Sequence, residues 1–427
     1  IGGRVVPGKW PTSPGSRLYL NESNAGEPKF VLATADQAPG LEQCQRATSA
    51  LWTDIDRDGW LDLIVTHEYG PVRVFANSLG KLRDVTEEIG FTKRTGIWNG
   101  IAGRDLDGDG DIDYVVTNFG INTTYEASMK KPELLYYGDL EGTGEFHVVE
   151  AKFGEENQLP RRGLSCSSNA MPSLKKKLGT YQNFAISSLE DIYTPKRLET
   201  SARLELRELQ SCVLINESKN GKIRFKMEPL PRIAQIAPGF GVVMTDLNGD
   251  WLTEVVLAQN FFSPQREVGR MSGSVGATVM SWSAKGNFEL VEPYRSGVLV
   301  TGDTKGVTVN EFNGDGVPDL AFTENSGPVT TFLNTSRGEF LCVRLKGKKG
   351  NLRAVGTRLT LRDDQGRSQT LEVASGGSYL SQSGSFHFFG AGKQGERGQL
   401  TLEAIWPDGK SLTLNDVKPG TIEVLWD

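Results

Sequence analysis

The chain has 427 residues, of which 23% are charged and 37% hydrophobic, the composition of a folded globular protein. Its 47 basic and 53 acidic side chains give a net charge of -6, which argues against a nucleic-acid partner because such proteins present a basic face. No apolar run approaches the roughly 18 residues of a membrane span. The 50 glycines indicate a chain that turns often.

Six segments predict β-hairpins, because each has alternating apolar positions on its strands and Asn, Gly or Ser at the turn. They span residues 17–34, 72–86, 134–151, 212–230, 278–293 and 330–345. Residues 1–5 align with the strand at 63–70 that precedes the second hairpin. We therefore expect the chain to begin inside a repeat unit, and an upstream segment of the same protein to complete the first blade of the fold.

An acidic nine-residue signature recurs between short apolar runs, at residues 54–62, 105–113, 246–254 and 311–319. Spacings of 51 residues between the first two copies and 65 between the last two fit four-stranded blades. We therefore predict an all-β chain with a β-propeller of six or seven blades over residues 1–344. The longer middle interval predicts a unit without an acidic loop at about 181–230 and an insertion near 155–180, whose basic residues are expected to be solvated.

The acidic signature predicts calcium sites. Side-chain oxygens at positions 1, 3, 5 and 9 would repel one another unless a hard cation held them, and the carbonyl at position 7 is a further expected ligand. Glycine at position 6 permits the bend that brings these oxygens together. The predicted ligands are Asp54, Asp56, Asp58, Trp60 and Asp62; Asp105, Asp107, Asp109, Asp111 and Asp113; Asp246, Asn248, Asp250, Leu252 and Glu254; and Glu311, Asn313, Asp315, Val317 and Asp319.

An EF-hand is excluded, because it requires a bidentate Glu at position 12 on a following helix. That position lies inside β-like runs and holds Val65, Val116, Leu257 or Phe322. The sites at Asp54 and Asp105 carry four acids each and are expected to bind calcium most tightly. The site at Asp246 has Trp251 in place of glycine and is expected to be the weakest. Filling all four would change the net charge from -6 to +2.

After about Arg344 the acidic signature stops, and short alternating strands separated by turn sequences predict a second domain at 345–427. This domain is expected to be a small antiparallel β-sandwich or barrel. Its strands are predicted near residues 357–363, 369–375, 385–390, 400–406, 411–414 and 421–426.

Both parts of the chain resemble known families. The acidic repeats resemble FG-GAP/VCBS repeats, as in integrin α-subunit propellers. The tail resembles an ASPIC/UnbV domain through the motifs VGTRL at 355–359, SGGSYLSQ at 375–382, HFFG at 387–390 and WPDG at 406–409. This resemblance implies a β-propeller with calcium in the loops between the first two strands of a blade, in a secreted or surface protein.

Two functions compete. The first is a non-enzymatic, calcium-stabilised binding scaffold that presents propeller loops to a protein or glycan partner. The second is a calcium-dependent polysaccharide lyase or hydrolase on a propeller fold. The sequence shows no nucleophile elbow, HExxH motif or phosphate-binding loop, and no catalytic residue is predicted, so the scaffold is favoured. An extracellular, periplasmic or cell-surface location is expected, because cytosolic free calcium is too low for such sites.

The remaining candidates favour structural roles. His67 and His387 are expected to pack inside the protein. Asn21, Asn216 and Asn334 begin Asn-x-Ser/Thr sequences but lie at predicted hairpin turns, where Asn is favoured for its conformation. The four cysteines form no zinc or redox motif, and their pairing stays open.

Overall fold

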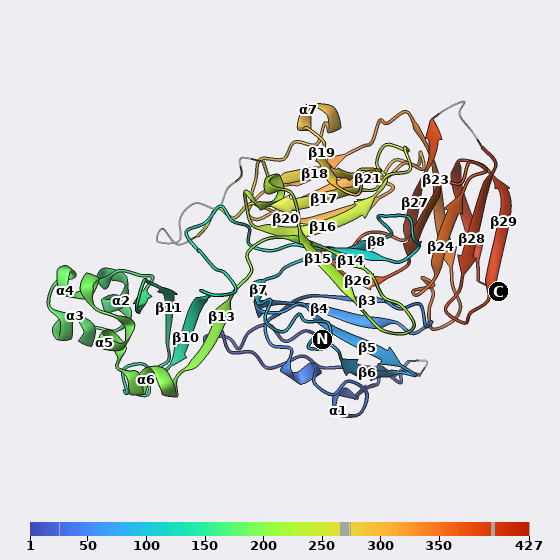
Figure 1. The fold of residues 1–427 in the computed structure, drawn as a ribbon. Helices are drawn as coiled ribbons and strands as arrows, with labels where there is room; N and C mark the ends of the chain where they lie inside the picture. Colours follow the sequence, from blue (N-terminus) through green and yellow to red (C-terminus); the bar gives the residue numbers. More distant parts are fainter. Residues whose placement is uncertain (25, 265–272, 274, 394–397, 427) are drawn as a thin grey trace.

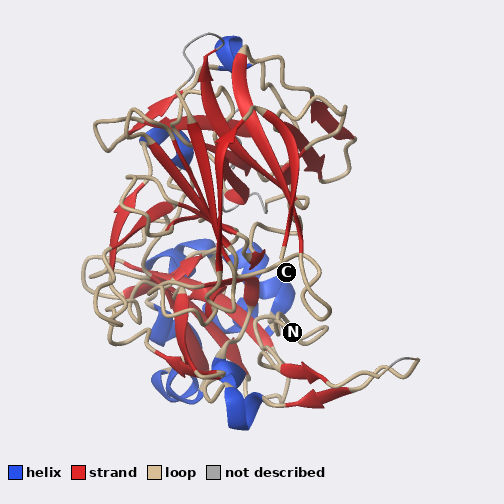
Figure 2. Ribbon diagram, turned by 90° about the vertical axis from the view of Figure 1, so that its right-hand side faces the viewer, coloured by secondary structure: helices blue, strands red, loops and turns tan. Residues whose placement is uncertain are grey.

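The computed structural model describes residues 1–24, 26–264, 273, 275–393 and 398–426. Antiparallel sheets make up most of it, and helices are few (Figures 1 and 2). The predicted all-β class is confirmed.

Four sheets carry an acidic loop between their first two strands, and we call them blades A to D (Figure 1). Blade A contains β3 (Ala47–Thr53), β4 (Asp62–Gly70), β5 (Arg73–Ser78) and β6 (Lys81–Asp84). Blade B contains β8 (Ile101–Arg104), β9 (Asp113–Val116), β14 (Cys212–Asn216) and β15 (Phe225–Pro229). Blade C contains β16 (Gly239–Thr245), β17 (Glu254–Gln259), β18 (Ala277–Trp282) and β19 (Phe288–Leu290). Blade D contains β20 (Thr304–Asn310), β21 (Asp319–Glu324) and β22 (Val329–Phe332).

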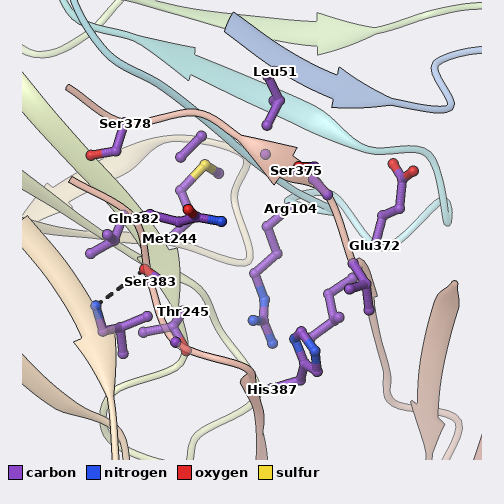
Figure 3. A pocket seen from close by; sticks show the side chains of 18 of the residues that line it. Leu51, Arg104, Met244, Thr245, Glu372, Ser375, Ser378, Gln382, Ser383 and His387 are labelled. Atoms are coloured by element: carbon purple, nitrogen blue, oxygen red, sulfur yellow. Dashed lines mark hydrogen bonds between the residues drawn. The ribbon is translucent and has the colours of Figure 1, made fainter. Parts of the chain in front are cut away.

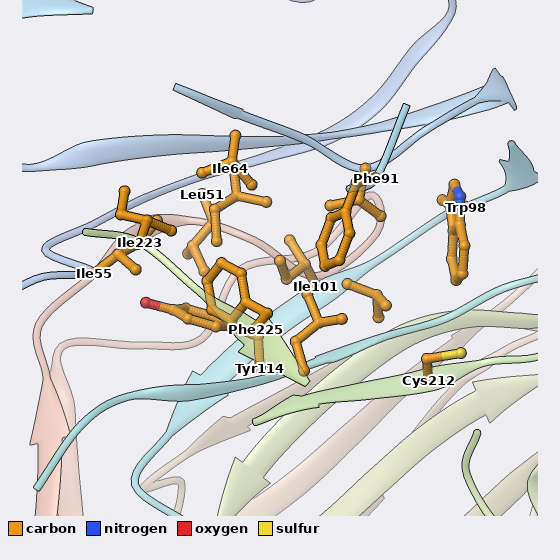
Figure 4. Packing of buried hydrophobic residues seen from close by; sticks show 14 of the residues in the cluster. Leu51, Ile55, Ile64, Phe91, Trp98, Ile101, Tyr114, Cys212, Ile223 and Phe225 are labelled. Atoms are coloured by element: carbon orange, nitrogen blue, oxygen red, sulfur yellow. The ribbon is translucent and has the colours of Figure 1, made fainter. Parts of the chain in front are cut away.

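The first strands of the four blades, β3, β8, β16 and β20, follow one another side by side. Apolar side chains fill the space between blades. Between A and B, for example, Leu51 and Ile64 meet Ile101, Tyr114 and Phe225 in one buried cluster (Figure 4). The described residues form four sheets with an acidic loop. The predicted number of six or seven blades is therefore not confirmed and stays a prediction.

Short elements surround the blades. The hairpin β1 (Tyr19–Asn21) and β2 (Phe30–Leu32), the helix α1 (Thr34–Gln37) and the 3-10 turn η1 (Leu41–Gln43) precede blade A, and β7 (Gly96–Ile97) pairs with β4. The 3-10 turn η2 (Arg232–Gln235) lies between blades B and C, and α7 (Pro293–Ser296) lies between C and D.

Blade B departs from the sequence prediction. Its third and fourth strands come from the hairpin at 212–230, because β14 pairs with β9. The expected separate unit at 181–230 is therefore wrong. The segment read as its first strand and loop is helical instead, and the hairpin alone carried no signal of which strand it would join.

The chain between β9 and β14 forms what we call the inserted subdomain, at the left of Figure 1. Its sheet has the order β12 (Gln158–Pro160), β11 (His147–Phe153), β10 (Glu133–Gly138) and β13 (Ala202–Leu206). Five short helices cover one face: α2 (Leu164–Ala170), α3 (Ser173–Leu178), α4 (Tyr181–Ile186), α5 (Leu189–Tyr193) and α6 (Pro195–Thr200). A capping box of Ser188 and Asp191 begins α5, and Pro195 at the first turn begins α6. The basic run at 175–177, expected in a solvated loop, lies on α3.

The C-terminal domain consists of two packed sheets, at the right of Figure 1. One holds β27 (Phe386–Lys393), β23 (Gly338–Lys346) and β30 (Gly420–Leu425), and the other holds β25 (Ser368–Glu372), β24 (Arg358–Arg362), β28 (Leu400–Ile405) and β29 (Ser411–Val417). All six strands predicted after residue 345 are present. The hairpin predicted at 330–345 is wrong, because β23 leaves blade D and pairs with β27 and, in parallel, with β30.

Residues 374–386, which we call the strap, leave the C-terminal domain and cross the inner strands of all four blades. The strap includes the short strand β26 (Ser375–Gly376), which pairs with β3. The hydrogen bonds run from Gly377 N to Ala50 O (2.7 Å), from Ser378 N to Ile101 O (2.6 Å), from Val242 N to Ser378 Oγ (3.2 Å) and from Val309 N to Ser383 Oγ (3.2 Å). The strap thus ties the C-terminal domain to the propeller blades.

Two further observations concern membrane spans and cysteines. Within the described residues, no helix is long and apolar enough to cross a membrane. All four cysteines are free thiols, and Cys44, Cys212 and Cys342 are buried.

The glycines of the strap lie too close to the inner strands to accept a side chain without strain. A Cβ on Gly376, whose φ is +92°, would lie 2.2 Å from Ala50 O. We predict that Gly376→Ala lowers the free energy of unfolding by about 3 kcal/mol through this clash and backbone strain. Gly366→Ala is the matched control, because Gly366 has φ +87° and nothing within 4 Å of its Cβ position, so about 1 kcal/mol is expected. Urea denaturation measures both, and equal losses would contradict the packing of the strap.

Candidate metal centres

The four acidic loops share one backbone conformation. In the second loop, Asp105 at position 1 accepts hydrogen bonds from the N–H groups of Gly108 (2.8 Å) and Gly110 (3.1 Å), which curls the loop around its carboxylate. Position 6 has a positive φ in every loop: 88° at Gly59, 88° at Gly110, 76° at Trp251 and 79° at Gly316. The left-handed bend that the sequence predicted at this position is therefore present, including at Trp251, where a bulky side chain makes it strained.

In blades A, B and D the position-9 acid, at the start of the second strand, joins the acidic loop to the end of the third strand. In blade A, Asp62 accepts hydrogen bonds from Ile55 N in the loop (2.8 Å) and from Asn77 N at the end of β5 (2.7 Å). Asp113 accepts in the same way from Leu106 N (2.9 Å) and Asn216 N (2.8 Å). Each oxygen keeps a second lone pair, so these bonds leave the carboxylate able to bind an ion as well.

The first two loops each bring three of their predicted ligands together, and Asp62 of the first loop and Asp109 of the second are not in these groups. Oxygens of Asp54, Asp56 and Asp58 lie within 4.8 Å of one another, and so do oxygens of the second group, Asp105, Asp107 and Asp113. In the first loop, Oδ1 of Asp56 is buried and has no hydrogen-bond partner. A cation would supply that partner, so the residues present fit a metal ion of the hard class.

Electrostatics in these loops also favour a cation. Burial, together with the neighbouring acids, raises the pKa of Asp62 and of Asp113 to about 8, and the pKa of Asp105 to about 6. The charged forms are thus costly without a counterion. A bound divalent ion would stabilise them, because an opposite charge favours ionisation.

The third and fourth loops are less open to an ion. Each oxygen of Asp246 accepts two hydrogen bonds, which use both of its lone pairs. Oδ1 accepts from Asn248 N (3.2 Å) and Gly249 N (2.6 Å), and Oδ2 accepts from Trp251 N (2.8 Å) and Gln369 Nε2 (2.9 Å). In the fourth loop, Asn313 Nδ2 donates to Asp315 Oδ2 (2.8 Å), so an ion would have to displace an amide hydrogen. These contacts support the expectation that the site at Asp246 is the weakest.

Neighbouring loops are linked by side chains. The amide of Asn216, which is 2% exposed, donates to Ile55 O of the first loop (2.9 Å) and to Ile112 O of the second (3.2 Å). Arg57 of the first loop pairs with Asp111 of the second. The buried amide of Asn216 is thus a structural bridge between blades A and B, a contact that its predicted place at a turn did not indicate.

The C-terminal domain packs against the acidic loops. Glu372 accepts hydrogen bonds from Asp54 N (3.0 and 3.1 Å) and Thr53 Oγ1 (2.6 Å), and Arg358 donates to Gly110 O. A cavity of about 460 Å³ lies here, lined by residues of both loops and by Arg358 and Trp406. The loops are therefore positioned by the second domain as well as by their own blades.

A second cavity, of about 200 Å³, lies beneath the strap (Figure 3). Arg104 and His387 project into it, and Arg104 donates to Gln369 Oε1 (3.0 Å) and Phe388 O (3.0 Å). Burial lowers the pKa of His387, and likewise of His67, to about 4, so both imidazoles are neutral at pH 7. His67 Nδ1 also lies 2.8 Å from Pro71 O, which agrees with its predicted structural role.

One cluster was missed by the sequence analysis. Glu141, Glu145 and His147 of the inserted subdomain also gather their ligand atoms within 4.8 Å. The signal was present as Asp139-x-Glu-Gly-x-Gly-Glu-x-His, but the segment was interpreted only as a hairpin turn.

The blades and their loops define a repeat protein of the β-propeller class. More particularly, residues 54–116 match the family model of the FG-GAP-like repeat, and residues 347–425 match the ASPIC and UnbV model. The first match runs from Asp54 to the end of β9 and includes two acidic loops. The second includes the strap. No curated protein matches the chain.

The bridge between the two loops generates a prediction. Asn216→Ala would leave the buried carbonyls of Ile55 and Ile112 without their donor, and we expect a loss of about 2–4 kcal/mol in the free energy of unfolding. Asn77→Ala is the control, because the Asn77 side chain donates to Leu61 O within blade A only (2.7 Å) and is partly exposed. Its expected loss is about 1 kcal/mol. Denaturant titration compares the two, and an equal or larger loss at Asn77 would contradict the bridging role.

Proposed function

We propose that the chain is a calcium-stabilised, extracellular binding scaffold. The observation that carries the proposal is the convergence of Asp54, Asp56 and Asp58, with a buried Asp56 oxygen that lacks any partner. The second loop supports it through Asp105 and Asp107. Calcium is the preferred ion in this proposal, because it accepts six to eight oxygens in irregular geometry.

The ions would act on the whole molecule in this proposal. The predicted ligands in the loops at Asp54 and Asp105 are adjacent to Glu372 and Arg358 of the C-terminal domain. Neutralising the loop acids would remove repulsion at this contact and hold the two parts together. Calcium would thus set the relative position of the blades and the C-terminal domain, and with it the surface offered to a protein or glycan.

An extracellular location is part of the same proposal, because it depends on calcium binding. FG-GAP repeats are typical of extracellular proteins. Sites of ordinary extracellular affinity would stay empty at cytosolic calcium levels. Neither matched family is a typical catalytic family, which favours a scaffold over a lyase or hydrolase.

Calcium should stabilise the fold measurably. We expect chelation to lower the thermal unfolding midpoint, and millimolar calcium to restore it, because ions that bind only the folded state stabilise it. Asp56→Asn should weaken calcium binding about tenfold or more by removing a charge from the first loop. Asp36→Asn, an exposed residue of α1, is the control and should behave as the wild type. An unchanged midpoint in chelator would overturn the calcium part of the proposal.

The scaffold and the enzyme make opposite predictions with acidic polysaccharides. For the scaffold we expect no product release from a panel of such substrates, and calcium-dependent binding to a component of a glycan or surface-protein array. Size-exclusion chromatography and ultraviolet absorbance follow the products, and binding in chelator provides the control. Product release that Asp56→Asn abolishes would favour the lyase or hydrolase instead.

A further inference from the structure

The loop at residues 139–147, between β10 and β11, repeats the backbone of the acidic loops. Asp139 accepts from Gly142 N (2.5 Å) and Gly144 N (3.0 Å), as Asp105 accepts from Gly108 N and Gly110 N. The φ values of Gly142 (82°) and Gly144 (84°) match those of Gly108 (80°) and Gly110 (88°). The inserted subdomain therefore contains a fifth loop of this type, in the same place between two antiparallel strands.

The side chains of this fifth loop differ from those of the others. Aligned with Asp-Leu-Asp-Gly-Asp-Gly-Asp-Ile-Asp at 105–113, it reads Asp-Leu-Glu-Gly-Thr-Gly-Glu-Phe-His. Position 5 has lost its acid, and position 9, which begins β11, is His147. A histidine replaces the buried carboxylate, so the site exchanges a hard oxygen ligand for an imidazole nitrogen.

The Nε2 atom of His147 faces the two carboxylates of the fifth loop. The residue is 7% exposed, and its Nε2 lies 3.6 Å from Glu141 Oε2 and 3.8 Å from Glu145 Oε2. Both distances exceed the 2.7–2.9 Å of a charge-assisted hydrogen bond. Its other ring nitrogen, Nδ1, is buried with no hydrogen-bond partner. Among the described residues, no hydrogen bond holds this ring at either nitrogen, although it faces two carboxylates.

The spacing fits an ion between the three groups. Two ligands about 2.0–2.1 Å from a tetrahedral zinc ion lie about 3.3 Å apart, so shifts of a few tenths of an ångström would bring His147 to that distance from each carboxylate. The ligand atoms of Glu141 and Glu145 lie within 4.8 Å of each other, so these two side chains would approach by at most about 1.5 Å. We propose that Glu141, Glu145 and His147 bind a divalent transition metal of the zinc class. One imidazole and two carboxylates give such an ion three protein ligands and leave one position for water. The two carboxylate charges balance the ion.

Glu141 is already oriented for this role. Its Oε1 accepts a hydrogen bond from Ser173 at the start of α3, which leaves Oε2 facing His147. Partners of this kind fix ligand carboxylates in metal sites. The ion would therefore join the loop and β11 to the helical layer of the inserted subdomain. This site shares no residue with the predicted calcium sites, so the zinc proposal and the calcium proposal can be tested separately.

The test is a zinc titration of the whole chain with about 1 mM calcium present to fill sites that prefer oxygen ligands. A chromophoric chelator that competes for zinc gives the dissociation constant. We expect one zinc ion per chain, and Glu141→Gln and His147→Gln should each weaken binding about tenfold or more. Glu145→Gln, at a side chain that is 74% exposed, should weaken it without disturbing the fold.

Glu156→Gln is the matched control, because it removes the same charge from an exposed position in the next turn of the sheet. Its zinc affinity should equal that of the wild type. His147→Asp restores the acid found at position 9 elsewhere and should lose zinc affinity while gaining affinity for calcium. Absence of zinc binding by the wild type would overturn the proposal, and so would binding that Glu145→Gln and His147→Gln leave unchanged.

Discussion

The position-9 carboxylate is the interaction on which blades A, B and D depend. It accepts one hydrogen bond from the loop before it and one from the end of the third strand, as Asp62 does with Ile55 and Asn77. Asp319 does the same with Phe312 N (2.9 Å) and Asn334 N (2.8 Å). A single buried side chain thus fixes the loop, the second strand and the third strand in one register. The curl of the loop, and therefore the gathering of the other acids, depends on this anchor.

The second constraint is the strap. The inner strands of a propeller surround an opening that side chains must fill, and here a segment of another domain supplies part of the filling. Because the strap bonds to β3, β8, β16 and β20, the C-terminal domain is attached to all four blades, through two backbone bonds and two bonds to serine hydroxyls. The acidic loops contact the same domain through Glu372 and Arg358. The C-terminal domain is therefore held to the blades at two separate places.

The sequence predicted the features that depend on residues close together in the chain. The loops, their bends and most hairpins follow from Asp, Asn and Gly at fixed offsets, and the C-terminal strands follow from alternation. The sequence did not predict the pairing of strands that lie far apart in the chain. Nothing in the hairpin at 212–230 indicates that β14 joins β9, and nothing in 330–345 indicates that β23 leaves blade D, because strand partners are chosen by burial across the whole fold. The motif at 375–382 was recognised in the sequence, but its contacts with the inner strands of the blades were not predicted.

The distant pairings have a consequence for how the chain is made. Val116 of blade B pairs with Cys212, and Trp52 of blade A pairs with Ser375. During synthesis from the N-terminus, the outward edge of β9 and the inner edge of β3 therefore remain unpaired until their partner strands are made much later. Unpaired edges are templates for aggregation, and long-range pairing is slow because loop closure precedes it. Both edges therefore stay exposed on the nascent chain until residues 212 and 375 have been synthesised.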